Sequence, residues 1–196
     1  MQRKLVSVFI ASVFFNLGAC DKKIEASVSE ASLQSQIKFG SPFKPTATLQ
    51  EIMLAIIDPN VDPIWNSIST TVSAEGTEEI RPETEDDWIK LRNHAITLRE
   101  VSNLLIVEGR KVAIDGASTS IHHSELDPHE IEAVISAHWP AFIGRAHALQ
   151  DAATLALNAI NAKDVDALEA AGSVIEHACE GCHSQFWYPD DRRPIE

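Results

Sequence analysis

The chain has 196 residues, 44% of them apolar and 23% charged, which suits one compact domain and excludes collagen-like and disordered classes. Acidic residues outnumber basic ones 29 to 16, so the formal charge is −13. Because the region after the amino-terminal segment has no Lys/Arg cluster, nucleic acid is not an expected partner. Three cysteines are too few for a disulfide-rich secreted scaffold.

The amino terminus has the pattern of an export signal. Arg3 and Lys4 precede an apolar stretch, Leu5 to Leu17, that is too short for a permanent membrane span and typical of a signal-peptide core. We therefore expect residues 1–19 to be removed on export. Their loss would leave 14 basic against 29 acidic residues, a charge of −15.

Cys20 follows Leu17-Gly18-Ala19, which resembles the lipobox of bacterial lipoproteins. In those proteins the peptidase cleaves before the cysteine, and the cysteine carries the lipid. The alternative is ordinary signal cleavage that leaves Cys20 as a free thiol. An exposed unpaired thiol is chemically awkward in an exported protein, so lipidation is favoured.

Two further features concern the anchor. Asp21, directly after Cys20, resembles the retention signal of inner-membrane lipoproteins. Residues 20–45 are polar and end in Gly40, Pro42 and Pro45, so we expect a flexible tether. The sequence thus predicts a periplasmic protein anchored to a bacterial membrane, the inner membrane in particular, through lipidated Cys20.

The first predicted helix begins near Thr48. Asp58-Pro59 and Asp62-Pro63 are expected to interrupt it, since proline breaks the helical hydrogen-bond ladder, and the run should resume around Ile64 and stop at Gly76. Its apolar face is formed by Leu49, Ile52, Met53 and Ile56.

The second predicted helix starts with a capping box, Thr84 with Asp87, and stops near Gly109. A long loop, 109–126, should follow. The core stripe of this helix is expected to be Trp88, Leu91, Ala95, Leu98, Ser102 and Leu105.

The third predicted helix opens at Asp127-Pro128 with Glu130 and should bend at Pro140. The fourth follows a short connection, 161–164, and ends at Pro189. No strand pattern or internal repeat is found. We therefore expect an all-α fold, an antiparallel four-helix bundle over residues 46–190, followed by a tail, 191–196.

The fourth helix carries a C-x-x-C-H motif, Cys179-Glu180-Gly181-Cys182-His183, the attachment signature of c-type haem. Residues at i, i+3 and i+4 share one helix face, so two thiols can bond the porphyrin while the imidazole reaches the iron. Phe186 continues the same face, so we expect it to be a further haem-binding residue. The motif predicts one covalent haem c, with His183 as the axial iron ligand.

Two other chemistries suit the same residues. A cysteine pair can form a redox disulfide, and His177 with Cys179, Cys182 and His183 can form a zinc site. A thioredoxin-like pair normally follows a strand in a βαβ unit, and structural zinc normally closes short loops. Because this motif lies within a helix, haem c is favoured.

With its motif on the last of four helices, the chain resembles class II cytochromes c, the cytochrome c prime family, over roughly residues 46–190. The resemblance implies an antiparallel bundle with covalent haem on the fourth helix and a distal side facing the first. It also raises homodimerisation, which is common in such bundles and which the sequence alone does not establish.

Met53 is the only methionine after residue 19. It lies on the apolar face of the first helix, where the resemblance places a thioether ligand in low-spin relatives, so we expect it to be the distal ligand. The alternative is that Met53 only fills a gap in the core.

Other polar residues fall within predicted apolar stripes. His94 and His138 could serve a bis-His haem, but hydrogen-bonded core residues are favoured. Arg145 could neutralise a haem propionate or pair with a carboxylate of another helix. The loop histidines His122, His123 and His129 are expected to be solvated, with adventitious metal binding as the minority interpretation.

The favoured function is a membrane-tethered periplasmic electron carrier. Its negative charge predicts a redox partner with a basic docking patch. The alternative is a five-coordinate, gas-binding protein for nitric oxide or carbon monoxide, in which Met53 packs without ligating iron. A haem peroxidase, which needs a distal His beside an Arg, is the least favoured.

Overall fold

The computed structural model describes residues 42–119 and 122–190. Its first helical run begins with α2 (Leu49–Ile52), continues as a π-helix, η1 (Met53–Ile57), and ends with α3 (Asp58–Trp65). Thr48 caps α2, because its side chain accepts the N–H of Glu51 while the Glu51 carboxylate accepts the N–H of Thr48. The start expected near Thr48 is confirmed.

The interruption expected at the two Asp-Pro pairs is wrong, because helical structure continues through both. In η1 the hydrogen bonds span one more residue than in an α-helix, and the N–H of Asp58 donates to the carbonyl of Met53. This wider turn comes directly before Pro59, which has no N–H to place in the ladder. The stop expected at Gly76 is also wrong, since α3 already ends at Trp65.

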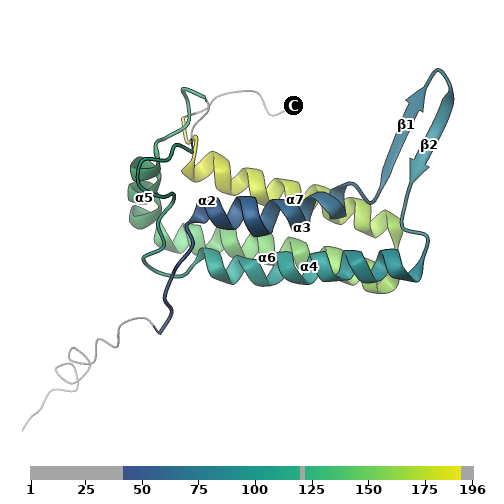
Figure 1. Ribbon diagram of the computed structural model, residues 1–196, viewed down its shortest axis with the longest axis horizontal. Coiled ribbons are helices and arrows are strands. Elements are labelled where there is room, and N and C mark those ends of the chain that lie inside the picture. Colours follow the sequence, from purple (N-terminus) through teal and green to yellow (C-terminus); the bar gives the residue numbers. More distant parts are fainter. Residues whose placement is uncertain (1–41, 120–121, 191–196) are drawn as a thin grey trace, which may run out of the picture. The chain divides into compact units, whose positions relative to one another are not determined.

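The remaining helices are α4 (Glu85–Leu105), α5 (Pro128–Ala137), α6 (Trp139–Ala162) and α7 (Val165–Phe186). The predicted capping boxes at Thr84 and Asp127 are both present. Lys163 adopts a left-handed conformation at the end of α6, and Asp164 caps α7. With so short a connection, α6 and α7 run side by side in opposite directions (Figure 1).

The third predicted helix is divided in two. The sequence predicts a bend at Pro140, but the helix breaks at His138, which ends α5 and precedes α6 with φ −123°. Pro140 therefore occupies the second position of α6, where its missing N–H is not needed by the helix.

The core lies where α6 packs against α4 on one side and α7 on the other, and α3 packs against α4 and α7 (Figure 1). Every residue of the predicted α4 stripe is buried. The loop after α4 is tied to this body, because the carbonyls of Lys111 and Val112 accept the first N–H groups of α2.

A β-hairpin corrects the expectation that the chain has no strands. β1 (Ser69–Ser73) pairs antiparallel with β2 (Gly76–Ile80), joined by a two-residue turn, and Gly76 has φ +138°, a conformation that favours glycine. Both strands are almost wholly exposed, so they show no apolar alternation. The described chain is otherwise mostly helical, as an all-α class requires.

Several expectations concern residues that the structure does not describe. The signal peptide 1–19, Cys20, nearly all of the tether and the tail 191–196 lie outside the described residues. In the ranges 42–119 and 122–190, no helix combines the length and apolar character that crossing a membrane requires.

Replacing one buried leucine tests this core. Leu98 of α4 is fully buried, so Leu98→Ala should lower the free energy of unfolding by about 2–5 kcal/mol, through lost burial and a residual cavity. Leu104 of the same helix is 42% exposed, and Leu104→Ala should cost about 1 kcal/mol or less. Urea unfolding of both variants measures the difference, and equal losses would contradict the packing described here.

Candidate functional site

The C-x-x-C-H motif occupies the last two turns of α7. Cys179, Cys182 and His183 are each half-buried, while Glu180 is exposed. Both cysteines are free thiols, and both pack against the apolar core. The expected sharing of one helix face is therefore present in the structure, as helical geometry dictates.

These three side chains line a cavity of about 130 Å³. Its walls come from η1, α3, α4, α6 and α7, so the cavity joins parts of the chain that are far apart in sequence. Most of the other lining side chains are apolar: Met53, Ile57, Val61, Trp65, Leu105, Phe142, Ala146, Leu149 and Ala178. The exceptions are Asp58 and Arg145.

Met53 lines the same cavity as Cys179, Cys182 and His183. It is the first residue of the π-helix and is half-buried against the core. π-Turns within helices are frequent at functional sites. The structure thus brings the predicted thioether and the predicted imidazole to one cavity from different helices.

Arg145 of α6 also lines the cavity, beside the motif. Its Nε donates to Oε1 of Gln185 at 2.8 Å. A Cβ atom built on Gly181 would lie 2.7 Å from the guanidinium Nη1, so the glycine inside the motif leaves room for this side chain. Within the described ranges no carboxylate forms an ion pair with Arg145, which leaves its charge available to an anionic group in the cavity.

Burial makes both thiols unusually weak acids. It raises the pKa of Cys179 to about 11 and that of Cys182 to about 12, and nearby carboxylates, Asp58 first among them, add to the shift at Cys179. Burial also lowers the pKa of His183, against the opposing effects of Glu180, Asp58 and Glu125. The imidazole is therefore neutral at pH 7, the form that can bind a metal ion.

Asp58 is the one acidic residue in the cavity wall. Desolvation, followed by repulsion from Asp62, raises the pKa of Asp58, and attraction to His183 partly offsets this. Sequence reasoning missed Asp58 because it treated the Asp-Pro pairs only as helix breaks. Trp65 also lines the cavity, and its indole N–H donates to the carbonyl of Gly172, but no sequence motif identified it as a site residue.

Phe186, predicted as a cofactor-binding residue, is fully buried at the end of α7 and does not line the cavity. Its ring meets Phe142 edge-on, with centroids 5.4 Å apart. Phe142 does line the cavity, so Phe186 lies behind the wall. On the other side of the motif, His183 lies near Trp187 and Tyr188, with ring centroids 5.8 and 6.5 Å away.

The other candidate histidines lie elsewhere. His94 is half-buried, and its Nδ1 lies 2.9 Å from Oδ1 of Asn60, the hydrogen-bonded role that the sequence favoured. His138 is exposed at the α5–α6 break, so its assignment to an apolar stripe is wrong. His122, His123 and His129 are exposed. Among the described residues, no three His, Cys, Asp or Glu side chains are grouped as a metal site requires.

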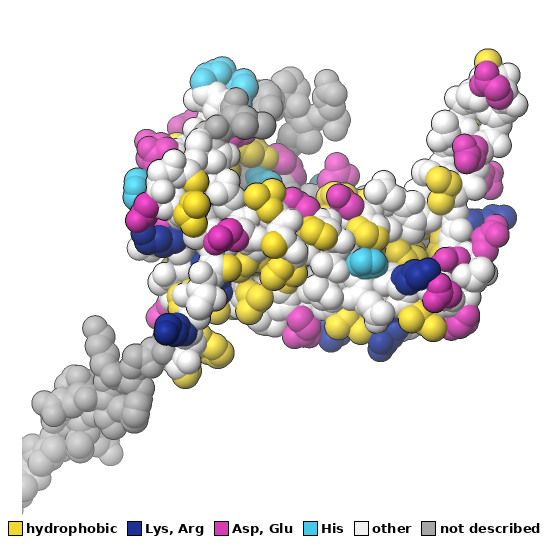
Figure 2. Space-filling view, viewed as in Figure 1, with side chains coloured by type: hydrophobic (Ala, Val, Ile, Leu, Met, Phe, Trp, Pro, Cys, Tyr) yellow, Lys and Arg dark blue, Asp and Glu magenta, His cyan; other side chains and the backbone are white. Residues whose placement is uncertain are grey.

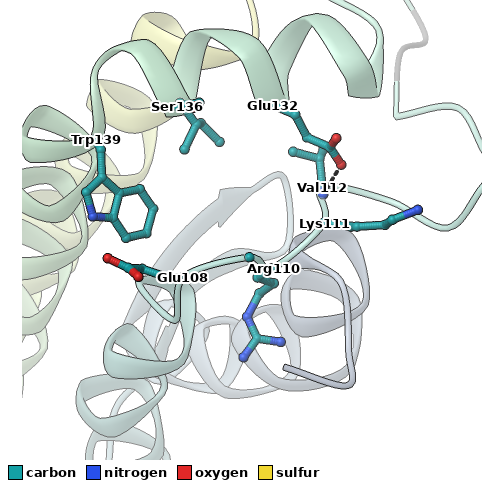
Figure 3. Close-up of a pocket in the computed structure, with 9 residues that line it drawn as sticks. Glu108, Arg110, Lys111, Val112, Glu132, Ser136 and Trp139 are labelled. Atoms are coloured by element: carbon teal, nitrogen blue, oxygen red, sulfur yellow. Dashed lines mark hydrogen bonds between the residues drawn. The ribbon is translucent and has the colours of Figure 1, made fainter. Parts of the chain in front are cut away.

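A larger cavity, about 480 Å³, lies between the loop after α4 and the α5–α6 break (Figure 3). Two of its polar side chains stabilise the fold: Arg110 donates to the carbonyls of Ala47 and Leu104, and Glu132 accepts the N–H of Val112. Trp139 also lines this cavity, but none of the site residues predicted from the sequence does. The motif cavity is therefore the candidate functional site, although it is smaller.

Comparisons with protein-family models, with curated proteins and with solved structures found no match to this chain.

The weak acidity of the thiols predicts slow alkylation of the folded chain prepared without haem. At pH 8 a pKa near 11 leaves roughly 100-fold less thiolate at Cys179 than a pKa near 9 does, and only the thiolate reacts. Iodoacetamide labelling, followed by peptide mass mapping, should accelerate about tenfold per pH unit from pH 8 to 10. In urea both thiols should react at ordinary rates; equal rates in folded and unfolded chains would contradict the burial.

Proposed function

We propose that this protein is a c-type cytochrome that carries electrons in the periplasm, tethered to a bacterial membrane through lipidated Cys20. Cys179 and Cys182 would hold one covalent haem c, and His183 would be its axial ligand. We further propose an antiparallel four-helix bundle of the class II cytochrome c type, formed by the α2–α3 run with α4, α6 and α7. The central observation is the C-x-x-C-H motif, whose three side chains meet Met53 at one mostly apolar cavity.

The donor set of the cavity fits a haem. Two free thiols, a neutral imidazole and a thioether are available, and the remaining wall is mostly apolar. Haem supplies a one-electron ferric–ferrous couple when bound, and thioether ligation stabilises the ferrous state. The Arg145 guanidinium, with no carboxylate ion pair in the described ranges, suits a propionate.

The charges near the motif support the predicted partner. Asp58, Glu176 and Glu180 all act on the pKa of Cys179, so three carboxylates lie around this side of the site. An anionic surface next to a redox centre attracts a partner with a basic docking patch, and salt weakens that attraction. The partner proposed is therefore a basic redox protein near the membrane.

One observation favours a second candidate, a five-coordinate protein that binds nitric oxide or carbon monoxide. Ile57, Val61 and Leu105 give the cavity an apolar lining, which suits a small uncharged gas. In that case Met53 is a packing residue. The two candidates share the haem attachment and differ in whether Met53 binds the iron.

Covalent attachment of haem is tested by exporting the chain in cells that carry a haem-maturation system. Haem should stay with the wild-type chain after acid–acetone extraction, since thioether bonds survive this treatment. Cys179→Ser together with Cys182→Ser should release it. Mass spectrometry of the intact chain measures the added haem. Complete extraction of haem from the wild type would contradict covalent attachment.

The Met53 assignment is tested by optical spectra of the ferric and ferrous protein, with and without carbon monoxide. The electron-carrier proposal expects low-spin bands with a methionine–iron charge-transfer feature and little reaction with carbon monoxide. Met53→Ala should abolish that feature and permit carbon monoxide binding. Leu54→Ala is the matched control, because Leu54 is its neighbour and 64% exposed. High-spin spectra that Met53→Ala leaves unchanged, with ready carbon monoxide binding, would favour the gas-binding candidate.

A further inference from the structure

The β1–β2 hairpin is an arm with no packed face. It projects from the helices in Figure 1, and every residue from Thr70 to Ile80 is exposed, Val72 by 77%. A lone two-stranded hairpin is at best marginally stable in water, because it buries little apolar surface and leaves two strand edges unpaired. Another strand would therefore stabilise this arm.

The two edges of the arm differ in chemistry. β2 contains Glu78 and Glu79, and Arg81 follows it, so charge protects this edge from further pairing. Figure 2 shows acidic side chains along the hairpin. β1 is Ser-Thr-Thr-Val-Ser, with no charge, no glycine and no proline. Only the β1 edge lacks the features that normally block strand addition.

The β1 sequence is also complementary to itself in the antiparallel direction. If two copies pair about a two-fold axis at Thr71, each Thr71 faces the same residue of the second copy, and Thr70 faces Val72. Ser69 then faces Ser73. Pairs of β-branched residues and of threonines stabilise antiparallel sheets, and no like charges meet in this register.

We propose that the β1 edge binds the β1 edge of a second copy of this chain, giving a four-stranded antiparallel sheet with two-fold symmetry. The two outer edges are then β2 strands protected by Glu78 and Glu79. Pairing therefore ends at a dimer and does not continue into a fibre. This proposal is independent of haem, since none of the hairpin residues lines the motif cavity.

The effect of salt distinguishes binding of a second copy of this chain from binding of a basic partner protein. The β1 edge is uncharged and does not select a basic strand. Two copies of a chain with a formal charge of −13, or −15 without residues 1–19, repel each other, and salt screens that repulsion. Dimerisation should therefore strengthen as salt is added, whereas binding of a basic partner to an acidic arm weakens.

Sedimentation velocity of the exported protein over a range of concentrations tests the proposal. Thr71→Lys places two lysines at the two-fold axis and should weaken the dimer about tenfold or more. Within one chain Thr71 pairs with Glu78, so the new lysine gains an opposite charge there and the hairpin should persist. Thr77→Lys is the matched control, since Thr77 lies on the outer strand and should leave dimerisation unchanged.

Cross-linking adds a readout that does not depend on affinity. Directly opposed residues of antiparallel strands have Cα atoms about 4.5–5.5 Å apart, which is within the range that a disulfide spans. Under mild oxidation Thr71→Cys should yield a disulfide between position 71 of the two copies, identified by peptide mapping, and Thr77→Cys should not. Three results would overturn the proposal: a monomeric wild type at all concentrations, equal effects of the two lysine variants, or no link at position 71.

Discussion

The packing of α6 between α4 and α7 is the constraint on which the rest of this structure depends. In its second half, α6 buries a series of alanines, Ala152, Ala153, Ala156 and Ala159, all at most 5% exposed. Small side chains at helix contacts permit close packing. The first half of α6 carries larger residues, Trp139, Phe142 and Arg145. Because α6 and α7 are antiparallel, these residues lie beside the end of α7, where the motif is.

The cavity lies at the end of α6 that carries these larger residues. Phe142, whose ring packs against Phe186, and Arg145, which lies beside Gly181, line the cavity together with the two thiols. The π-helix then supplies Met53 and Ile57 from the first helical run. Burial of these side chains raises the pKa of both thiols and lowers the pKa of His183, which stays neutral at pH 7. The packing of the helices therefore also sets the acid–base properties of the site.

The helical periodicity of the sequence was sufficient for most of the fold. The α4 stripe, the capping boxes at Thr84 and Asp127 and the short connection before α7 all follow from local patterns, and all are present. The failures also have physical reasons. Proline rules predicted breaks in the first helix, but a π-turn precedes Pro59. The sequence analysis did not predict the hairpin, because an exposed hairpin needs no apolar alternation. Its residues did carry a signal, since Thr70, Thr71, Val72 and Gly76 are typical of strands and turns.

The motif and its helical spacing were determined by the sequence alone, since residues at i, i+3 and i+4 share a helix face in any α-helix, and the proposed haem attachment follows from that spacing. Only the tertiary structure decided which other residues meet that face. Met53 and Arg145 line the cavity, Phe186 lies behind its wall, and His138 faces solvent. Asp58 also lines the cavity, although no sequence pattern predicted it there. Such choices depend on how helices distant in sequence pack together, and local periodicity does not specify that packing.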